Sequence, residues 1–281
     1  MNVLVTGRGT GGSFQVRGVQ LGQAIGATVI PDARDVAAYD LVIVVKRPSL
    51  GLLERVRRAG VLLVYDVVDA WPQPAGNTWD RNACLEWLRE QMRVIQPAAI
   101  VAATRAMADD CERFGVPVLW LPHHAWEAQG SAVIGSQVRR VGYQGGLNYL
   151  GYWRDFMQAE CRRRGWEWVE NPPTIAALDI VVAVREQQGY AARAWKSNCK
   201  LANAQGCGVP FIGAREAGYL ETASGGELWA DTPREMVEAL DALTPQLARV
   251  QAASRMIDAA PRLVDIARRY REWLDGAAVH A

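Results

Sequence analysis

Basic and amide side chains gather where one predicted helix begins in the second half of the chain. The members of this group are Arg193, Lys196, Ser197, Asn198 and Lys200. Ser197 or Asn198 can cap the helix, whose first amides have no partner inside it and carry the positive end of the helix dipole. Cations beside such a helix end make an anion site that suits a diphosphate. An ordinary capped helix with a solvated basic loop is the alternative.

The segments on either side of this group are compatible with a ligand site. The apolar strand predicted over 178–186 ends in Arg185 and Glu186, so its polar end falls close to the helix start. The helix predicted over 197–207 is poor in large apolar side chains and carries small ones such as Ala202. Small residues allow a ligand, or a neighbouring sheet, to come close to the helix backbone.

A glycine-rich turn follows the first predicted strand. Gly7, Gly9 and Gly12 form a G-x-G-x-x-G pattern, and Asp32 follows the next strand, as in the dinucleotide-binding fingerprint. This pattern keeps an NAD(P)-dependent oxidoreductase or epimerase as an alternative. The Tyr-x-x-x-Lys pair of short-chain dehydrogenases is absent, however, and Ser13 stands where a Walker loop has its lysine. We expect the turn to line a cleft where a substrate approaches the backbone. The residues concerned are Gly9, Thr10, Gly11, Gly12 and Ser13.

Further candidates stand near the ends of other predicted strands. Lys46 and Arg47 end a strand at an expected edge of the cleft, and Trp71 lies in a Pro- and Gly-rich loop where it can stack on a sugar or a base. His123 and His124 are adjacent on an extended segment, so their side chains point to opposite faces and do not suit one metal ion. We expect these histidines to pack or hydrogen-bond between two domains, or to contact the substrate.

Short apolar runs alternate with helical segments along the chain, which is the pattern of parallel sheets covered on both faces. The predicted strands include 2–7, 27–30, 40–45, 61–68, 98–104, 116–122, 139–145, 178–186 and 209–213. The predicted helices include 13–25, 50–59, 81–95, 105–114, 149–164, 197–207, 232–243 and 245–258. The expected parts are a Rossmann-like domain over 1–124, a linker over 125–137, a second Rossmann-like domain over 138–260 and a last helix over 261–281.

The composition is that of a globular protein. The 281 residues carry a net charge of +1 and half of them are hydrophobic, which predicts neither a strong nucleic-acid binder nor a membrane-surface protein. No apolar run approaches the roughly 20 residues of a membrane span, and the first residues do not read as a signal peptide. The five cysteines are scattered, as reduced thiols usually are. We expect a cytoplasmic protein, with its oligomeric state left open.

The stretch KLANAQGCGVPFIGAREAGYLE, which begins at Lys200, resembles the donor-binding segment of GT-B glycosyltransferases. It is most similar to the family-four-like retaining members. Lys200, Leu201, Gly208 and Pro210 match the family pattern, and Asn203 stands where the family has a ribose-binding Glu.

The first half resembles the same family. Its glycine-rich loop and the following Arg-bearing helix are similar, and the stretch DVVDAWPQP resembles the loop after the family's fourth strand, with Asp69 matching the family's Asp. The resemblance implies an α/β architecture of two Rossmann-like parallel-sheet domains facing a central cleft, the GT-B fold. The helix after Pro261 would cross back to the N-terminal domain. The first domain would bind the acceptor, and the second the donor.

The implied activity is transfer of a sugar from a nucleotide-sugar donor, a UDP-sugar, with retention and without a metal or other cofactor. The acceptor would be a hydroxyl group, for which a hydroxymethylated base in phage DNA is one candidate. The catalytic candidates are Asp69, Lys196 and Lys200. The donor-binding candidates are Arg185, Glu186, Arg193, Ser197, Asn198, Asn203, Glu216, Tyr219 and Glu221. The candidates for the acceptor side of the cleft are Gly9, Thr10, Gly11, Gly12, Ser13, Lys46, Trp71, His123 and His124.

The chain departs from the family at its Glu-x7-Glu pair, because Trp195 and Asn203 stand in those two positions. Glu186 or Glu216 can take the role of the first Glu, and Val68 replaces the family's His. A non-catalytic, glycosyltransferase-like nucleotide-binding protein therefore stays an alternative.

Overall fold

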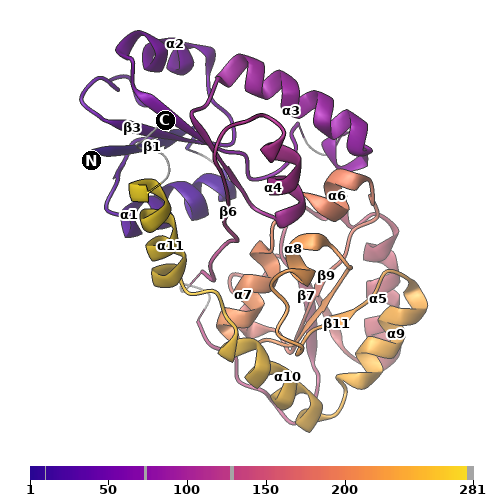
Figure 1. The fold of residues 1–281 in the computed structure, drawn as a ribbon. Helices are drawn as coiled ribbons and strands as arrows, with labels where there is room; N and C mark the ends of the chain where they lie inside the picture. The colour runs from indigo at the N-terminus through magenta and orange to yellow at the C-terminus, as the bar shows by residue number, and fades with distance from the viewer. Residues whose placement is uncertain (10, 73–74, 127–129, 277–281) are drawn as a thin grey trace.

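The computed structural model describes residues 1–9, 11–72, 75–126 and 130–276. They form two α/β halves, each built on one parallel sheet, which Figure 1 shows as two lobes. This arrangement confirms the predicted fold class of two parallel-sheet units.

The first sheet has the strand order β2-β1-β3-β4-β5-β6, and its strands are all parallel. The strands are β1 (Val3–Gly7), β2 (Thr28–Val29), β3 (Leu41–Val45), β4 (Leu62–Asp66), β5 (Ala99–Ala102) and β6 (Val118–Trp120). Every residue of β1 and β3 is buried, as expected for strands covered on both faces. Gly7 pairs with Val45, so the loops that leave these two strands begin side by side.

Helices cover both faces of this sheet. The helical segments of the first half are η1 (Phe14–Gln20), α1 (Leu21–Ala24), α2 (Leu50–Ala59), η2 (Ala75–Thr78), α3 (Arg81–Ile95) and α4 (Arg105–Glu112). Side chains of α2, α3 and α4 pack on one face, and those of η1 and α1 pack on the other. The helix predicted over 13–25 begins as a π-helix, η1, before it continues as α1.

The second sheet has the strand order β11-β10-β9-β7-β8, again all parallel. The strands are β7 (Arg140–Tyr143), β8 (Glu167–Glu170), β9 (Ile180–Ala183), β10 (Phe211–Gly213) and β11 (Leu228–Trp229). The short edge strand β11 was not predicted. The order reverses direction between β7 and β9, which is the position where open α/β sheets bind ligands beyond their carboxyl ends.

The helical segments of the second half are η4 (Leu147–Tyr149), α5 (Tyr152–Arg164), η5 (Ile175–Ala177), α6 (Tyr190–Ala194), α7 (Cys199–Cys207), α8 (Ala217–Leu220), α9 (Pro233–Ala242), α10 (Gln246–Asp258) and α11 (Leu263–Gly276). Side chains of α5 and α9 pack on one face of the second sheet, and those of α7 pack on the other. The segment before Lys196, predicted as a loop, contains the short helix α6.

The last helix, α11, belongs to the core of the first half. Its residues Ile266, Ala267, Tyr270 and Leu274 are buried in the apolar cluster that also contains strand β1 and the start of the chain's first helix. Figure 1 shows α11 beside α1, far along the chain from it. The predicted crossing of the C-terminal helix is therefore confirmed for the described part, while 277–281 lie outside the described residues.

A second contact joins the halves through α6. Ala191, Ala194 and Trp195 are buried in the core of the first half, where Trp195 lies 6.0 Å from Trp87 between ring centroids. The carboxylate of Asp110 accepts hydrogen bonds from the Tyr190 hydroxyl at 2.6 Å and from Trp195 Nε1 at 3.0 Å. Because these contacts come from opposite halves, they hold the two sheets in a fixed relation.

No helix of the described residues is both long enough and apolar enough to cross a membrane. In the segment predicted as a linker, the described residues 125–126 and 130–137 contain neither helix nor strand. Residues 127–129 of that segment lie outside the described part of the chain.

Candidate functional site

Two cavities meet where the carboxyl ends of strands from both sheets face each other. The first has a volume of about 430 Å³ and includes Gly145, Arg185, Lys196, Ser197 and Lys200 among its lining residues; we call it the lysine chamber. The second has a volume of about 390 Å³ and includes Arg8, Gly9, Gly11, Lys46 and Arg47; we call it the arginine chamber. Gly12 and Tyr149 line both cavities, so the chambers adjoin.

The lysine chamber lies at the point where the second sheet reverses its strand order. Gly145 follows β7 and Arg185 follows β9, and these two strands are neighbours in the sheet. Gly145 has a φ of 145°, and a Cβ there would lie 3.3 Å from Lys200 Nζ. A glycine at this turn therefore lets the Lys200 ammonium lie against the backbone.

Both lysines of this chamber are buried enough to disfavour their charge. Lys200 Nζ donates to the Tyr143 hydroxyl at 3.2 Å and lies 4.5 Å from the centre of that ring. Burial, with Arg185 nearby, lowers the pKa of Lys200 to about 8. Burial also lowers the pKa of Lys196 to about 8, although Asp69 opposes the shift.

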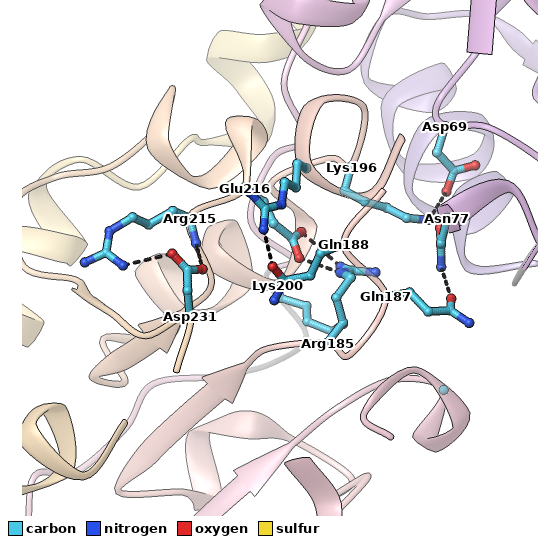
Figure 2. Close-up of polar contacts among 12 residues, drawn as sticks. Asp69, Asn77, Arg185, Gln187, Gln188, Lys196, Lys200, Arg215, Glu216 and Asp231 are labelled. Atoms are coloured by element: carbon cyan, nitrogen blue, oxygen red, sulfur yellow. Dashed lines mark hydrogen bonds and ion pairs between the residues drawn. The ribbon is translucent and has the colours of Figure 1, made fainter. Parts of the chain in front are cut away.

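Two carboxylates balance part of this positive charge. Arg185 and Glu216 form a buried ion pair in which Arg185 Nη2 donates to Glu216 Oε2 at 3.0 Å. Lys196 reaches across from the second half toward Asp69, as Figure 2 shows. Its Nζ atom lies 3.4 Å from Asp69 Oδ2. Lys200 makes no ion pair within the described part of the chain, which leaves its charge for a ligand.

Asp69 bridges the two chambers. Its Oδ1 atom lies 2.5 Å from Lys46 Nζ, which lines the arginine chamber, and its Oδ2 atom faces Lys196 of the lysine chamber. Val68 and Lys46 both have positive φ values, 65° and 64°, which are unusual for residues with a Cβ. Such backbone strain clusters at functional sites, where the surrounding structure enforces it.

The sequence contains only three lysines among 31 basic Lys and Arg residues, and these are Lys46, Lys196 and Lys200. All three line the two chambers. The cleft therefore holds every lysine of the chain, together with Arg8, Arg47 and Arg185, whereas the basic residues elsewhere are all arginines. A lysine differs from arginine in presenting a compact charge whose pKa falls readily on burial.

The start of α7 only partly follows the prediction. Ser197 lines the lysine chamber. Asn198 stands at the N-cap position, but its side chain does not cap the helix. Its Oδ1 atom instead accepts from His123 N at 2.7 Å, and its Nδ2 atom donates to His123 O at 3.1 Å. Asn198 thus fixes the segment that leaves the first half.

Asn203 and Tyr219 line the lysine chamber, as the donor-binding prediction requires. The Asn203 Oδ1 atom, however, already accepts a hydrogen bond from Trp126 N at 3.0 Å. Its expected contact with a ribose hydroxyl therefore has a competitor inside the protein. Tyr219 is buried and packs edge-on against Phe211.

Besides Asn198 and Glu216, three more predicted donor residues are not among those that line the lysine chamber. Arg193 is exposed on α6 and donates to Gln188 Oε1. Glu221 Oε2 accepts from Arg105 N at 2.8 Å, so this carboxylate sits at the start of α4 in the other half. Glu186 lies beside the turn before α5, where a Cβ on Gly151 would collide with its carboxylate. The sequence places these three residues close to Lys196 and Lys200 along the chain, but it does not show in which direction their side chains point.

The acceptor-side predictions divide in the same way. Gly9, Gly11, Gly12, Ser13 and Lys46 line the arginine chamber, while Thr10 lies outside the described residues. Trp71 does not line either chamber, because its ring packs against Trp87 at 5.9 Å and under Arg47 at 5.2 Å. The expectation that Trp71 offers a free stacking face therefore needs correction.

The two histidines lie in the interior, and neither lines a chamber. His124 Nε2 is 2.7 Å from Gln20 Oε1, and burial, with Arg17 nearby, lowers the pKa of His124 to about 4. Burial also holds the pKa of His123 well below its usual value. Their position matches the packing interpretation rather than substrate contact. No group of three or more His, Cys, Asp or Glu residues that could hold a metal ion occurs in the part of the chain that the structure describes.

Sequence reasoning missed several residues of the chambers, and Arg8 and Tyr149 are the two that matter most for the site. Arg8 lies between Gly7 and Gly9, so its place in a substrate-facing loop was a usable signal. Tyr149 lines both chambers. In the sequence it stands where a helix is predicted to begin, and no motif around it indicates a binding site.

The chain matches no protein-family model, and no curated protein matches it by sequence. Solved structures do match it. HepE from Anabaena, solved with UDP and glucose, has a TM-score of 0.66 at 12% identity, covering 98% of this chain and 100% of that one. The sucrose-phosphate synthase of Thermosynechococcus elongatus has a TM-score of 0.60 at 10% identity, covering 99% and 100%. A trehalose-6-phosphate synthase has a TM-score of 0.58 at 11% identity, covering 94% and 78%.

All three of these structures are GT-B glycosyltransferases. The chain has the GT-B fold. This likeness extends over both sheets and the crossing helix, since nearly the whole chain is aligned with HepE. The first sheet and its glycine turn accordingly form one wall of a GT-B cleft.

Proposed function

We propose that this GT-B chain is a glycosyltransferase that moves a sugar from a nucleotide-sugar donor to a hydroxyl acceptor. The observation that carries the proposal is the cluster of Lys196, Lys200 and Arg185 at the strand-order reversal of the second sheet, in which Lys196 and Arg185 are buried and Lys200 is half-buried. It stands at the start of α7, a nine-residue helix whose dipole adds positive charge there. Cations at this position suit the diphosphate of a donor.

The proposed reaction develops negative charge where these cations lie. The bond between the anomeric carbon and the diphosphate oxygen breaks, and a bond from the acceptor hydroxyl oxygen to that carbon forms. The nucleoside diphosphate leaves with the bonding electron pair. Fixed cations in a water-poor site stabilise this developing charge without having to reorganise. Lys200, which has no carboxylate partner among the described residues, is our assignment for the closest such contact.

The donor nucleotide in the proposal is UDP. HepE, which shares the fold over nearly its whole length, was solved with UDP and with UDP-glucose. We further propose that transfer retains the anomeric configuration, in line with the trehalose-6-phosphate synthase, whose structure concerns transfer with retention. In that geometry the hydroxyl attacks the face that the diphosphate leaves, so the departing phosphate oxygen can take the hydroxyl proton. The lysines supply the positive charge in this scheme, so it requires no metal ion.

Asp69 has a separate role in this proposal. Because it lies between Lys46 and Lys196, it orients both ammonium groups at the junction of the chambers. It is therefore a positioning residue for Lys196. The proposed acceptor hydroxyl would enter from the arginine chamber, since Gly12 and Tyr149 are common to both cavities.

Titration calorimetry with UDP and ADP, followed by an assay for UDP release from UDP-glucose, tests the proposed function. We expect UDP to bind more tightly than ADP, and Lys200→Ala to weaken UDP binding about tenfold or more because a charged contact is lost. Arg58→Ala, on an exposed face of α2, is the control and should leave UDP binding unchanged. Absence of UDP binding, with binding of NAD(H) instead, would support an oxidoreductase. UDP binding with no turnover of any UDP-sugar would indicate a non-catalytic nucleotide-binding protein.

A further inference from the structure

The arginine chamber stands at the strand-order reversal of the first sheet. Arg8 leaves the end of β1, and Lys46 and Arg47 leave the end of the neighbouring strand β3. Loops at such a reversal converge on one crevice. Three cations from two adjacent loops therefore face the same cavity of about 390 Å³.

The positive charge of this chamber is largely uncompensated. No Asp or Glu is among the residues that line it. Lys46 is paired with Asp69, which also serves Lys196. Arg8 and Arg47 form no ion pair with any residue that the structure describes. Two arginines with no carboxylate partner, on the wall of one cavity, create a field that attracts an anion.

Arg47 is held in place and still lacks an acceptor. Its guanidinium lies over the Trp71 ring at 5.2 Å, which fixes the side chain from one side. Its Nε atom is buried and has no hydrogen-bond partner among the described residues. A buried cationic donor without an acceptor is unfavourable, and an anionic ligand is a direct way to satisfy it. The adjacent residue, Lys46, has a φ of 64°, and such strain is frequent where side chains are aimed at a ligand.

We propose that the arginine chamber binds the acceptor through an anionic group, a phosphate ester or a carboxylate, held by Arg8 and Arg47. This inference rests on the proposed function, because it names the class of acceptor: a sugar or polyol that carries a negative charge. The arginine fork matches both phosphate and carboxylate oxygens. An acceptor anchored there presents a hydroxyl group at Gly12 and Tyr149, where the two chambers meet.

The size of the chamber favours a small acceptor over a nucleic acid. A volume of about 390 Å³ is that of a small-molecule pocket. A DNA strand would in addition need a track of cations along its backbone. The net charge of the chain is only +1, which provides little general attraction for a polyanion.

Calorimetry on the full chain in the presence of saturating UDP tests this inference. The probes are inorganic phosphate, glucose 6-phosphate, glucuronate and neutral glucose, at matched ionic strength. In the proposed function UDP occupies the lysine chamber, so the second anion is tested for binding in the arginine chamber, and the variants below locate that binding. We expect glucose 6-phosphate or glucuronate to bind at least about tenfold more tightly than glucose, since a charge-assisted hydrogen bond is gained. The stronger of the two anions identifies phosphate or carboxylate as the recognised group.

The Arg8→Ala and Arg47→Ala double variant should lose that tenfold preference while keeping the same affinity for UDP. Arg47→Lys keeps the positive charge but loses the planar guanidinium that can donate two parallel hydrogen bonds. We expect this variant to lose part of the preference for the anionic sugars over glucose. Arg58→Ala, which removes an exposed arginine of the same half, is the matched control and should change nothing. Arg8 is exposed, so the single Arg8→Ala variant should fold like the native protein. Its loss of preference for the anionic sugars can therefore be measured without a change in core packing.

Several results would overturn the inference. Equal binding of glucose and its anionic derivatives would do so, and so would an unchanged preference in the double variant. Binding of a duplex oligonucleotide that requires Arg8 and Arg47, without binding of the small anions, would replace it with a DNA acceptor. If UDP fails to bind while glucose 6-phosphate still binds through Arg8 and Arg47, the anion site stands and the proposed glycosyl transfer fails.

Discussion

Lys196 and Lys200 are held in surroundings that make their charge sensitive to pH. Burial lowers the pKa of each to about 8, so both are largely protonated at pH 7 and largely neutral at pH 9. An arginine in either position would stay charged over this range. Lysine at these positions, in a chain whose other basic residues except Lys46 are arginines, places compact cations that titrate near neutral pH in the cleft.

The first prediction concerns this titration. UDP should bind the protonated lysines, so its affinity should fall about tenfold between pH 7 and pH 9 for each lysine that contacts the diphosphate. Calorimetry at intervals across this range measures the fall. In the Lys200→Arg variant, the part of the fall in UDP affinity that is due to residue 200 should disappear, because arginine does not titrate between pH 7 and pH 9. A native profile that is flat from pH 7 to pH 9 would contradict the assignment.

The second prediction concerns His124, whose folded-state pKa is about 4 against a usual 6.5. Between these values the unfolded chain binds a proton that the folded chain does not, so the free energy of unfolding should fall as the pH drops below about 6.5. The expected loss is about 1.4 kcal/mol per pH unit for such a histidine. Urea unfolding from pH 7 to pH 5.5 measures it. His124→Gln should reduce the slope, and an unaltered slope would show that His124 is not the cause.

At the scale of single elements, the glycine turn after β1 contains positions with different demands. Gly9 has a φ of 77°, and a Cβ there would lie 2.5 Å from Pro31 Cβ. Gly11 has no atom within 4 Å of the place where its Cβ would be. Gly9 is thus required by the fold of the turn, whereas Gly11 leaves open space in the arginine chamber.

The third prediction follows from this difference. Gly9→Ala should destabilise the protein by about 1–2 kcal/mol or more, from the left-handed backbone and the collision with Pro31. Gly11→Ala should change the free energy of unfolding by less than about 0.5 kcal/mol. Urea unfolding of the pair, made in the same background, measures both values. Equal stability of the two variants would contradict the geometry of the turn.

Helix α6 was not predicted from the sequence. Its stretch of small residues around Arg193 resembled a loop before a capped helix. In the structure its buried side chains Ala191, Ala194 and Trp195 fill a space in the core of the other half. A close approach makes this possible, since a Cβ on Gly189 would lie 2.5 Å from the Thr78 carbonyl carbon. The tertiary contact, and not local propensity, decides this segment.

At the scale of the whole molecule, Asp110 joins the two lobes. It is buried in the first half and accepts hydrogen bonds from Tyr190 and Trp195 of the second, while Arg81 donates to it at 2.8 Å from its own half. Glu221 makes a second link by accepting from Arg105 N. Polar bridges of this kind set the relative position of the chambers, on which the proposed transfer would depend.

The fourth prediction tests the bridge. Asp110→Ala should lower the free energy of unfolding by about 2–3 kcal/mol, because it leaves Tyr190 and Trp195 with unpaired donors at a buried contact. We also expect weaker UDP binding, through the displaced start of α7. Tyr190→Phe removes a single bond and should cost about 1 kcal/mol. Asp258→Asn, at an exposed end of α10, is the control. Wild-type stability of Asp110→Ala in urea would refute the role of this bridge.

The sequence by itself determined the layers of the molecule. Near-continuous apolar strands separated by amphipathic helices can be buried only in parallel sheets covered on both faces, and the loosened stretch after His124 separates two such units. The apolar residues of the final helix required a partner, which proved to be the first sheet. The position of Lys196 and Lys200 at a helix start could also be read locally.

Only the tertiary structure decided which polar groups face the cleft. Asn198, Arg193 and Glu221 have the residue types of a donor site, but their side chains go to His123, Gln188 and the start of α4. Arg8, Arg47 and Tyr149 are far apart in sequence and meet because two strand ends and a second lobe converge. A local pattern specifies secondary structure and burial. The direction of a side chain, and any partner it finds far away in the sequence, are set by packing of the whole chain.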